Sequence, residues 1–409
     1  MTTDVPRLRP LPLQCQAMLA ICSDLDETPD RRVYAEIARF LNTAQTTAMG
    51  QGVDLEVGNT IYFDMPPGQF AYWNTDDAGR EMVRSLIRSG HVDCLHSFGD
   101  LATTREHAKR AIDELSRHDC RLECWVDHAS APTNVGADIM HGSGDVPGSP
   151  AYHTDLTCDF GIRFVWRGRV TSVIGQDRPP SWRGVFTIRH PVASTRTIAK
   201  EFAKHILARR GNNKYAMHGP NEILRPVTLR DGQPAYEFIR CNPYWGRVDG
   251  ADTAAGLAEV LTPRFLNRLT QRQGVCILYT HLGKVRDPAK PFDKPTVDVL
   301  RHLADMAHRG EILVTTTRRA LGFCLARRQI RFQSDCAEGC CTIRIATRNG
   351  TMHHGPSDLD GLTFYVDDPG RTRLFIDNAE VPNLLRHPPD SSGRRSVSLP
   401  WRRLVFPGL

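Results

Sequence analysis

The sequence contains no long apolar run, and its first residues do not predict a leader sequence. No apolar run in its 409 residues approaches the ~20 residues needed to span a bilayer. The first residues, Met1 to Pro6, contain no positively charged stretch followed by an apolar one, as a signal peptide would. The sequence therefore predicts a cytoplasmic protein with no membrane span.

Basic stripes interleaved with aromatic residues, which nucleic-acid-binding proteins use, are also missing. The net charge is only +6, from 52 basic and 46 acidic residues, and Arg far outnumbers Lys. A hydrophobic content of 40% and a charged content of 24% are ordinary for a soluble enzyme. These values argue against a nucleic-acid partner and favour a small-molecule or glycan substrate. They leave the oligomeric state open.

Paired Cys-x-x-Cys motifs, which would indicate a zinc knuckle, are absent from the 12 cysteines. Several cysteines lie within apolar runs, which predicts reduced and buried thiols. The closely spaced Cys336, Cys340 and Cys341 lack the spacing of a metal site as well. We therefore expect free thiols there too.

The most informative stretch is the apolar run from Ala17 to Ser23, which leads directly to Asp24 and Asp26. Such a run is typical of a strand buried on both faces, as in a parallel sheet covered by helices. Side chains two residues apart in a strand point the same way, so both carboxylates would face the strand's C-terminal end, where ligands bind. Two close carboxylates repel each other unless a cation or a shared proton neutralises them. The pattern predicts a hard-metal or acid/base site at the first strand.

Strand and helix patterns alternate along most of the chain. Strands are expected at 60–64, 92–100, 122–128, 162–166, 274–281 and 312–314, and helices at 29–51, 77–90, 104–117, 191–210, 256–272, 296–309 and 316–326. This repetition predicts an α/β protein with a parallel barrel or a doubly wound sheet. Short alternating strands with Gly, Asp and Pro turns follow. We expect an N-terminal extension at 1–16, an α/β domain at 17–328 and a small β-rich C-terminal module at 329–409.

Polar residues of catalytic type collect where these strands end. His96 and Asp100 follow one strand and are an imidazole and a carboxylate of the kinds that bind divalent metals. His281 ends a late strand and is a candidate general acid. Considered alone, each has an ordinary structural alternative, a capping Asp or a hydrogen-bonded His. Further candidates at strand ends and in a loop are Trp125, Asp127, His128 and His153.

Together these motifs resemble the polysaccharide deacetylases, the NodB-type enzymes of carbohydrate esterase family 4. The resemblance rests on an apolar strand ending in two Asp, a His-Ser-x-x-(His/Asp) motif and a late strand ending in Leu-x-x-His. It is closer to divergent members associated with surface-polysaccharide biosynthesis, through the runs Cys22-Ser23-Asp24-Leu25-Asp26, His96-Ser97-Phe98-Gly99-Asp100 and Tyr152-His153-Thr154-Asp155-Leu156. It covers roughly residues 17 to 325 and implies an irregular (β/α) barrel of the deacetylase type.

The resemblance implies a metal-dependent hydrolase that removes an acetyl or other N-acyl group from an amino sugar or a sugar-containing biosynthetic intermediate. Asp24 would then be the base that activates a metal-bound water, and His281 the acid that protonates the leaving amine. Asp26, His96 and Asp100 would bind a divalent metal, zinc first, with Ni, Co, Fe or Mn as alternatives.

The chain departs from the family pattern at several points. Asp100 stands where the family motif has its second His, which makes the ligand set harder. Leu25 separates two Asp residues that are adjacent in the family, so Asp24 and Asp26 both remain candidates for the metal, and the base stays unassigned. No Arg-x-Pro-Tyr or Asp-x-x-Asp-Trp motif is found. The residues expected on the substrate side are Trp125, Asp127, His128 and His153.

Two other functions stay open. The run Asp24-Leu25-Asp26-Glu27-Thr28 also matches the Asp-x-Asp-x-Thr signature of haloacid dehalogenase-like phosphatases, in which Asp24 would be the nucleophile and Mg²⁺ the cofactor. Such a site also needs a Lys followed by an acidic pair, whereas Gly99-Asp100 precedes the nearest Lys, Lys109. The other alternative is a non-catalytic glycan-binding relative, in keeping with Asp100 and the missing motifs.

Overall fold

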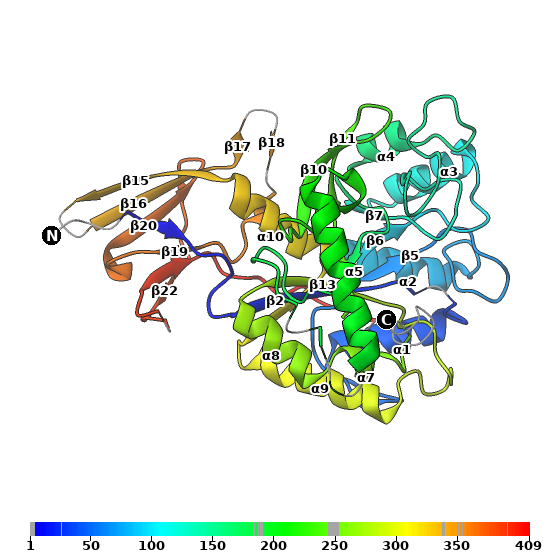
Figure 1. Cartoon of the computed structure of the whole chain (residues 1–409), viewed down its shortest axis with the longest axis horizontal. Coiled ribbons are helices and arrows are strands. Elements are labelled where there is room, and N and C mark those ends of the chain that lie inside the picture. Colours follow the sequence, from blue (N-terminus) through cyan, green and yellow to red (C-terminus); the bar gives the residue numbers. More distant parts are fainter. Residues whose placement is uncertain are drawn as a thin grey trace.

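A computed structural model of the chain describes residues 5–25, 27–182, 185–186, 188, 191–243, 253–337, 340–349, 352–353, 355–390 and 392–409. These residues form a mixed α/β part around a curled sheet and a smaller all-β part beside it (Figure 1). The predicted α/β class is therefore confirmed. Asp26 lies outside the described residues.

The main sheet holds the strands that carry the predicted site residues. Its strand order is β10-β11-β8-β7-β6-β5-β2-β13-β12-β9, and β14 also pairs with β2. The hairpin β10–β11 is antiparallel, whereas the other pairings between these strands are parallel. The strands are β2 (Ala17–Ser23), β5 (Asn59–Ile61), β6 (Val92–His96), β7 (Cys124–Val126), β8 (Phe164–Trp166), β9 (Val170–Thr171), β10 (Leu224–Thr228), β11 (Pro234–Phe238), β12 (Arg240–Cys241), β13 (Val275–Thr280) and β14 (Ile312–Thr315).

The register of β2 and β13 brings two predicted residues side by side. All seven residues of β2 are buried, as its apolar sequence predicts. Its last residue, Ser23, pairs with Thr280, the last residue of β13. Asp24 and His281 therefore leave neighbouring strands at the same level of the sheet.

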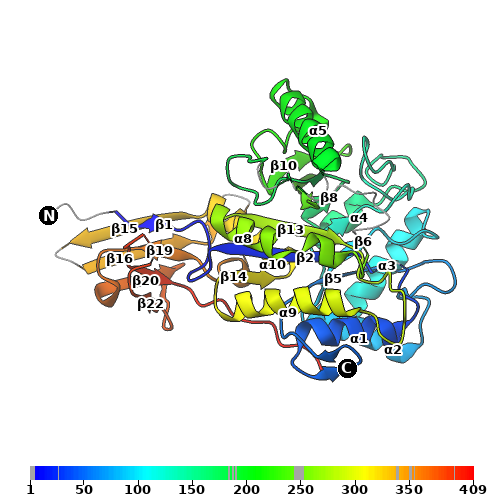
Figure 2. The ribbon, with the colours of Figure 1, turned by 60° about the horizontal axis from the view of Figure 1, so that its bottom comes forward.

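Helices cover the outside of the curled sheet (Figure 2). They are α1 (Arg31–Asn42), α2 (Asp77–Arg88), α3 (Arg105–Arg117), α4 (Thr154–Phe160), α5 (Pro191–Arg209), α7 (Leu257–Val260), α8 (Pro263–Arg272), α9 (Lys294–His308) and α10 (Thr317–Gln329), with 3-10 turns η1 (Asn213–Tyr215), η2 (Pro356–Asp358) and η3 (Pro369–Arg371). Asp30 caps α1 and Gly90, with φ +83°, follows α2, as the sequence predicts. None of the helices in the described ranges combines the length and the apolar character that crossing a bilayer requires.

Two sequence-based expectations about the middle of the chain are corrected. The helix predicted over 256–272 is broken into α7 and α8, because Thr262 caps the second helix and Pro263 opens it. The hairpin β10–β11 and the strand β12 were not predicted, although Asp231-Gly232 between β10 and β11 is a turn signal.

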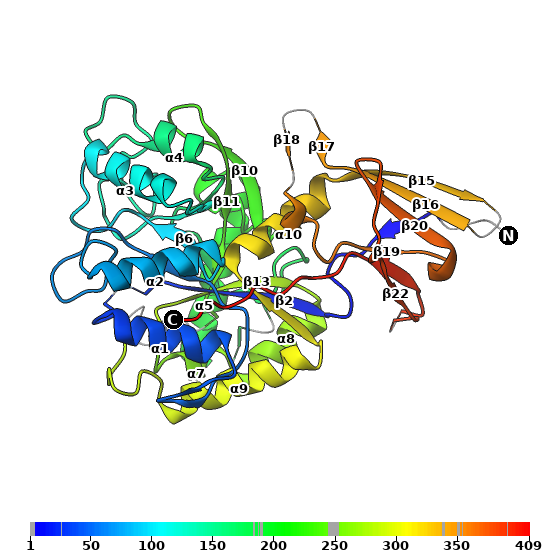
Figure 3. The same ribbon diagram turned by 180° about the vertical axis from the view of Figure 1, so that it is seen from behind.

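The all-β part consists of two four-stranded sheets, β1-β19-β23-β22 and β15-β16-β20-β21. Their strands are β1 (Arg7–Leu8), β15 (Arg331–Ala337), β16 (Cys340–Ala346), β19 (Thr363–Tyr365), β20 (Thr372–Ile376), β21 (Ala379–Glu380), β22 (Leu385–His387) and β23 (Ser396–Ser398). Two further pairs of strands form separate two-stranded ribbons: β3 (Thr46–Thr47) with β4 (Gly50–Gln51), which follow α1, and β17 (Arg348–Asn349) with β18 (Met352–His353). The first strand of the chain, β1, belongs to the all-β part, and the C-terminus lies beside α1 of the α/β part (Figure 3). The predicted N-terminal extension thus adds a strand to the β part, and the end of the chain packs beside Arg39 of α1.

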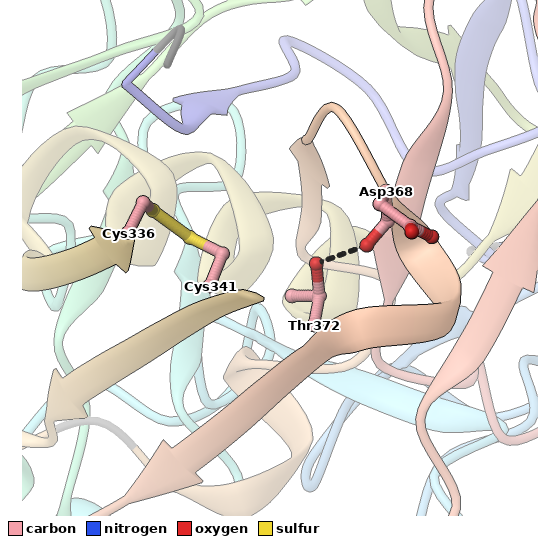
Figure 4. The surroundings of a disulfide bond; sticks show 4 residues. All are labelled: Cys336, Cys341, Asp368 and Thr372. Carbon is pink, nitrogen blue, oxygen red and sulfur yellow. Dashed lines mark hydrogen bonds between the residues drawn. A yellow bond between two sulfur atoms is a disulfide. The ribbon is translucent and has the colours of Figure 1, made fainter. Parts of the chain in front are cut away.

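One disulfide in the β part corrects the prediction of free thiols. Cys336 of β15 and Cys341 of β16 lie directly opposite each other and are joined (Figure 4). Nearby, the Thr372 hydroxyl donates a hydrogen bond of 2.7 Å to the Asp368 carbonyl. The antiparallel pairing, which the spacing of the cysteines does not reveal, brings the two sulfur atoms together. Cys340 remains free and exposed, and the free cysteines of the α/β part are mostly buried, as predicted.

Candidate functional site

The predicted residues converge on one cavity at the carboxyl ends of the parallel strands. The cavity has a volume of about 180 Å³ and is lined by Asp24, His96, Asp127, His128 and His281. Trp166, Tyr279 and Lys284 complete much of its wall. Ligands of parallel α/β sheets bind at this edge, so the cavity is the candidate functional site.

Asp24 forms a buried ion pair with Arg240. The Arg240 guanidinium donates hydrogen bonds of 2.6 Å to Asp24 Oδ2 and 3.1 Å to Oδ1. The Asp24 residue is 1% exposed and Arg240 is 0% exposed, so water screens this pair very little. Burial alone would raise the pKa of Asp24, but Arg240 and then His96 outweigh it and hold the pKa well below its usual range. Asp24 is therefore a permanently ionised carboxylate.

Arg240 was not predicted as a site residue. Its guanidinium lies over the Trp166 ring, 4.2 Å from the centroid, and 5.3 Å from the Tyr279 ring centroid. Aromatic faces attract such a cation and fix its plane. Arg240 could have been found from the run Arg240-Cys241-Asn242-Pro243-Tyr244, which differs from the Arg-x-Pro-Tyr motif by one inserted residue.

Two histidines face the same oxygen of Asp24. His96 Nε2 lies 3.2 Å from Asp24 Oδ2, and His281 Nε2 lies 3.9 Å from it. The His96 ring stacks on Tyr62 at a centroid distance of 4.5 Å, while the Tyr279 hydroxyl lies 3.5 Å from His281 Nε2. Burial lowers the pKa of His96 despite the neighbouring carboxylate. His96 is therefore a neutral imidazole at neutral pH.

Asp100 lies on the outer side of the site and pairs with His128. His128 Nδ1 is 2.8 Å from Asp100 Oδ1, and the Asp100 side chain is 41% exposed. The His128 ring meets the His96 ring edge-on, with centroids 5.0 Å apart. The structure thus brings His96 together with Asp24, and Asp100 together with His128.

Three residues at the ends of the site strands adopt a left-handed backbone conformation. They are Ser97, which follows His96 (φ 52°), Ala129, which follows His128 (φ 42°), and Glu27 (φ 59°). Non-glycine residues rarely adopt such angles, and strained residues of this kind cluster at functional sites. Their gathering at this edge supports a functional role for the cavity.

Neutral thiols lie beneath the polar layer. Cys22 precedes Asp24 by two residues and Cys94 precedes His96 by two, so in each strand they face the same side as the site residue. Both cysteines are buried, and burial raises the pKa of each thiol well above its usual value. The floor of the site is therefore uncharged.

Trp125 and His153, predicted on the substrate side, do not line the cavity. Trp125 is 1% exposed and His153 is 0% exposed, and their rings pack together at a centroid distance of 4.8 Å. His153 Nε2 lies 2.7 Å from the Thr133 carbonyl, and burial lowers its pKa to about 4. Both residues support the core behind the site.

Asp127 is held by Trp125 from behind. The Trp125 indole and the Val135 amide both donate to Asp127 Oδ1, at 2.8 and 2.9 Å. Asp127 is 0% exposed, and burial raises its pKa to about 7. Asp127 can therefore gain or lose a proton near neutral pH, unlike Asp24.

Asp127→Asn should change how stability depends on pH. The folded wild type keeps the Asp127 proton up to about pH 7, whereas an unfolded Asp loses it near pH ~3.9, so wild-type stability should fall as the pH rises between these values. The amide keeps the oxygen that Trp125 and Val135 bind and removes this fall, a relative gain of roughly 3 kcal/mol between ~pH 5 and ~pH 8. Urea unfolding at ~pH 5 and ~pH 8 would measure it. Asp113→Asn, at an exposed position, is the control, and parallel curves for wild type and Asp127→Asn would contradict the expectation.

The residues present partly fit a divalent metal. Within the described residues, which leave out Asp26, no group of three or more His, Cys, Asp and Glu side chains is arranged to hold a metal ion. His96 suits a ligand, because it is neutral and its buried Nδ1 has no hydrogen-bond partner in the described part of the chain. Asp24 is already compensated by Arg240 through both oxygens. His96 is therefore a candidate ligand, and the rest of a metal site is not found among the described residues.

Comparisons with known proteins add no assignment to this geometry. A scan against protein-family models and a search of the curated proteins each found no match to this chain.

Proposed function

We propose that this chain is a metal-dependent hydrolase that removes an acetyl or other N-acyl group from an amino sugar. The observation that carries the proposal is the convergence of Asp24, His96 and His281 on one cavity, with Asp24 fixed by Arg240. The set supplies an anionic carboxylate, a neutral imidazole for a metal and a second imidazole for proton transfer.

We further propose that the curled sheet is an irregular (β/α) barrel, as the resemblance to the deacetylases implies. Strands β11 and β12 follow each other directly in the sequence, within residues 234–241, and they belong to opposite ends of the curled sheet. Tyr236 of β11 pairs with Phe164 of β8, and Cys241 of β12 pairs with Leu278 of β13. These pairings support closure of the sheet around the polar layer that holds the site.

Within this proposal each described residue has a distinct role. Asp24, ionised at all physiological pH values, accepts a hydrogen bond from the attacking water and aligns it. His281, whose Nε2 lies 3.9 Å from Asp24 Oδ2, donates a proton to the departing nitrogen, and the proton that the attacking water loses returns to His281 through Asp24. Arg240 positions Asp24 by donating to both of its oxygens.

The metal would be held by His96, with Asp26 and Asp100 as the carboxylates that the resemblance implies, and Asp100 would have to leave His128 to join them. When bound, a divalent ion lowers the pKa of its water and polarises the acyl carbonyl. Lys284 and Trp166, which line the cavity, are placed to contact the sugar. The small volume of the cavity, about 180 Å³, favours a compact acyl group over a long one.

The phosphatase alternative is disfavoured by the same ion pair. A nucleophilic Asp must turn one oxygen freely toward phosphorus. Both oxygens of Asp24 instead accept hydrogen bonds from Arg240, and the side chain is almost completely buried. The phosphatase mechanism also gives no role to His96 or His281.

Two histidine variants test the proposed reaction. The purified chain, supplied with Zn²⁺ or another transition metal, should release acetate from members of a panel of N-acetylated amino sugars. His96→Ala should lose both the metal and activity, and His281→Ala should keep the metal but lose about 10³-fold in kcat. Metal content and acetate release are measured on the same samples.

The matched control is His308→Ala, which alters an exposed histidine at the end of α9. It should leave metal content and turnover unchanged. Hydrolysis of phosphate esters with Mg²⁺, unaffected by His281→Ala, would instead support the phosphatase. Sugar affinity without turnover of any acetylated sugar would support a binding protein.

A further inference from the structure

Helix α5 (Pro191–Arg209) has its polar side buried and its apolar side exposed. The helix lies at the outer edge of the α/β part, away from the β sheets of the C-terminal part (Figure 2). Its buried residues are Ser194, Thr197, Glu201, Lys204 and His205. A surface helix of a globular protein normally buries its apolar stripe instead. The reversed arrangement shows that the apolar side of α5 is not part of the core.

The buried polar side is anchored by specific contacts. Lys204 Nζ donates to Glu201 Oε1 at 2.7 Å and to the Val170 carbonyl at 3.0 Å. The Thr171 hydroxyl donates to Glu201 Oε2 at 3.0 Å. Because Val170 and Thr171 form β9, which pairs with β12, α5 rests on a strand next to the one that carries Arg240. The orientation of the helix is therefore fixed by hydrogen bonds.

Apolar side chains are exposed on α5 and on two described residues shortly before it. These side chains, here called the α5 patch, are Phe186, Ile188, Val192, Phe202 and Leu207, which are 41%, 86%, 81%, 48% and 37% exposed. They make up half of the large exposed hydrophobic side chains in the described part of the chain. Concentrated exposure of this kind marks an interaction surface.

Positive charge borders the α5 patch. Arg196, Lys200, Arg209 and Arg210 are all exposed. On a helical projection, Arg196 and Lys200 flank Leu207, and Arg209 lies beside Phe202. The one acidic residue between 191 and 210 is Glu201, which is buried and paired with Lys204. The exposed side of α5 is therefore apolar in the middle, cationic at its borders and free of carboxylates over this range.

We propose that the α5 patch binds the surface of a membrane that contains anionic lipids, with α5 lying in the plane of the interface. Apolar side chains between cationic borders are the arrangement with which interfacial helices insert below anionic headgroups. A protein interface has a polar rim of no fixed sign, whereas the border of this patch carries positive charge alone over 191–210. The proposal concerns this face alone and does not depend on the reaction in the cavity.

Vesicle binding by the full-length chain tests this proposal. The wild type should sediment with vesicles of phosphatidylcholine and phosphatidylglycerol, and not with phosphatidylcholine alone. Ile188→Asp/Val192→Asp should weaken binding about tenfold or more, because two inserted apolar side chains become anions. Arg196→Gln/Lys200→Gln should weaken it about fivefold per charge, and added salt should have the same effect on the wild type.

The matched control is Val405→Asp, because Val405 is as exposed as Val192 but lies in the C-terminal tail. It should bind vesicles like the wild type. Failure of the wild type to bind anionic vesicles would overturn the proposal, as would full binding by Ile188→Asp/Val192→Asp. A wild-type dimer in sedimentation velocity that this double variant converts to a monomer would also overturn it, since a second copy would then cover the patch.

Discussion

Arg240→Met is expected to lower the free energy of unfolding by about 3–5 kcal/mol at neutral pH. The substitution leaves Asp24 buried at 1% exposure without the guanidinium that binds both its oxygens. His96 is neutral and His281 is 3.9 Å away, so neither replaces that cation. The carboxyl group must then remain ionised in a poorly solvated place or take up a proton, and either outcome costs stability.

The pH dependence of this loss has a definite sign. In the wild type the pKa of Asp24 is lowered, so its contribution to stability is present above the unfolded value of ~3.9 and is lost as the pH falls toward the folded pKa. In Arg240→Met burial raises the pKa of Asp24 instead. The difference in stability between the two proteins should therefore be largest at neutral pH and shrink in acid.

Urea unfolding of matched variants checks this expectation. Lys109→Met removes one partner of the Lys109–Asp113 pair, whose side chains are 63% and 50% exposed, and should cost at most ~1 kcal/mol. Asp24→Asn/Arg240→Met removes both buried charges and should recover much of the loss, since a buried pair is often replaceable as a whole. A single Arg240→Met variant no less stable than Lys109→Met would show that Asp24 does not depend on Arg240.

The residues at the carboxyl ends of the strands were largely predictable from sequence. An apolar run of strand length followed by a polar residue marks a strand end, and parallel strands bring these ends to one edge. Asp24, His96, Asp127, His128 and His281 were found in this way, and all line the cavity. The rule is local in sequence, so it needs no knowledge of which strands are neighbours.

The partners of these residues were not predictable, because they depend on pairings between distant segments. Asp24 and Arg240 are 216 positions apart, and the strand of Arg240 is only two residues long. Asp100 was expected beside His96 from its spacing, whereas the chain after β6 turns it toward His128. Trp125 looked available for a sugar, but its indole donates to Asp127 and its ring packs in the core.

Helix α5 shows that the sequence can predict a helix without predicting which of its faces is buried. Its helical pattern was recognised over 191–210, but the hydrophobic pattern does not reveal which face is buried. The buried face is chosen by Glu201 and Lys204, whose partners Thr171 and Val170 lie on β9. A polar network between segments can thus overrule the usual rule that the apolar face turns inward.

The second large effect is expected where the β part meets the α/β part, at Asp358. This carboxylate is 0% exposed, and it accepts hydrogen bonds of 3.0 and 3.1 Å from Arg163 and lies 3.1 Å from Arg318 Nη1. Asp358→Ala leaves both cations to share the carboxylate of Glu123 and should cost about 3 kcal/mol of unfolding free energy. Urea unfolding and limited proteolysis of the β part would measure the loss.

Gly322 of α10 allows a second test of the position of Asp358. A Cβ atom at Gly322 would lie 2.3 Å from Asp358 Oδ1, so Gly322→Ala should push Asp358 away from its arginines and destabilise the wild type. In the Asp358→Ala background that obstacle is gone, and the same substitution should stabilise by up to about 1 kcal/mol, because Ala favours a helix over Gly. A change of sign between the two backgrounds, measured in a double-mutant cycle, would show that the glycine is required by the approach of Asp358. Equal effects in both backgrounds would show that α10 and Asp358 are not in such close contact.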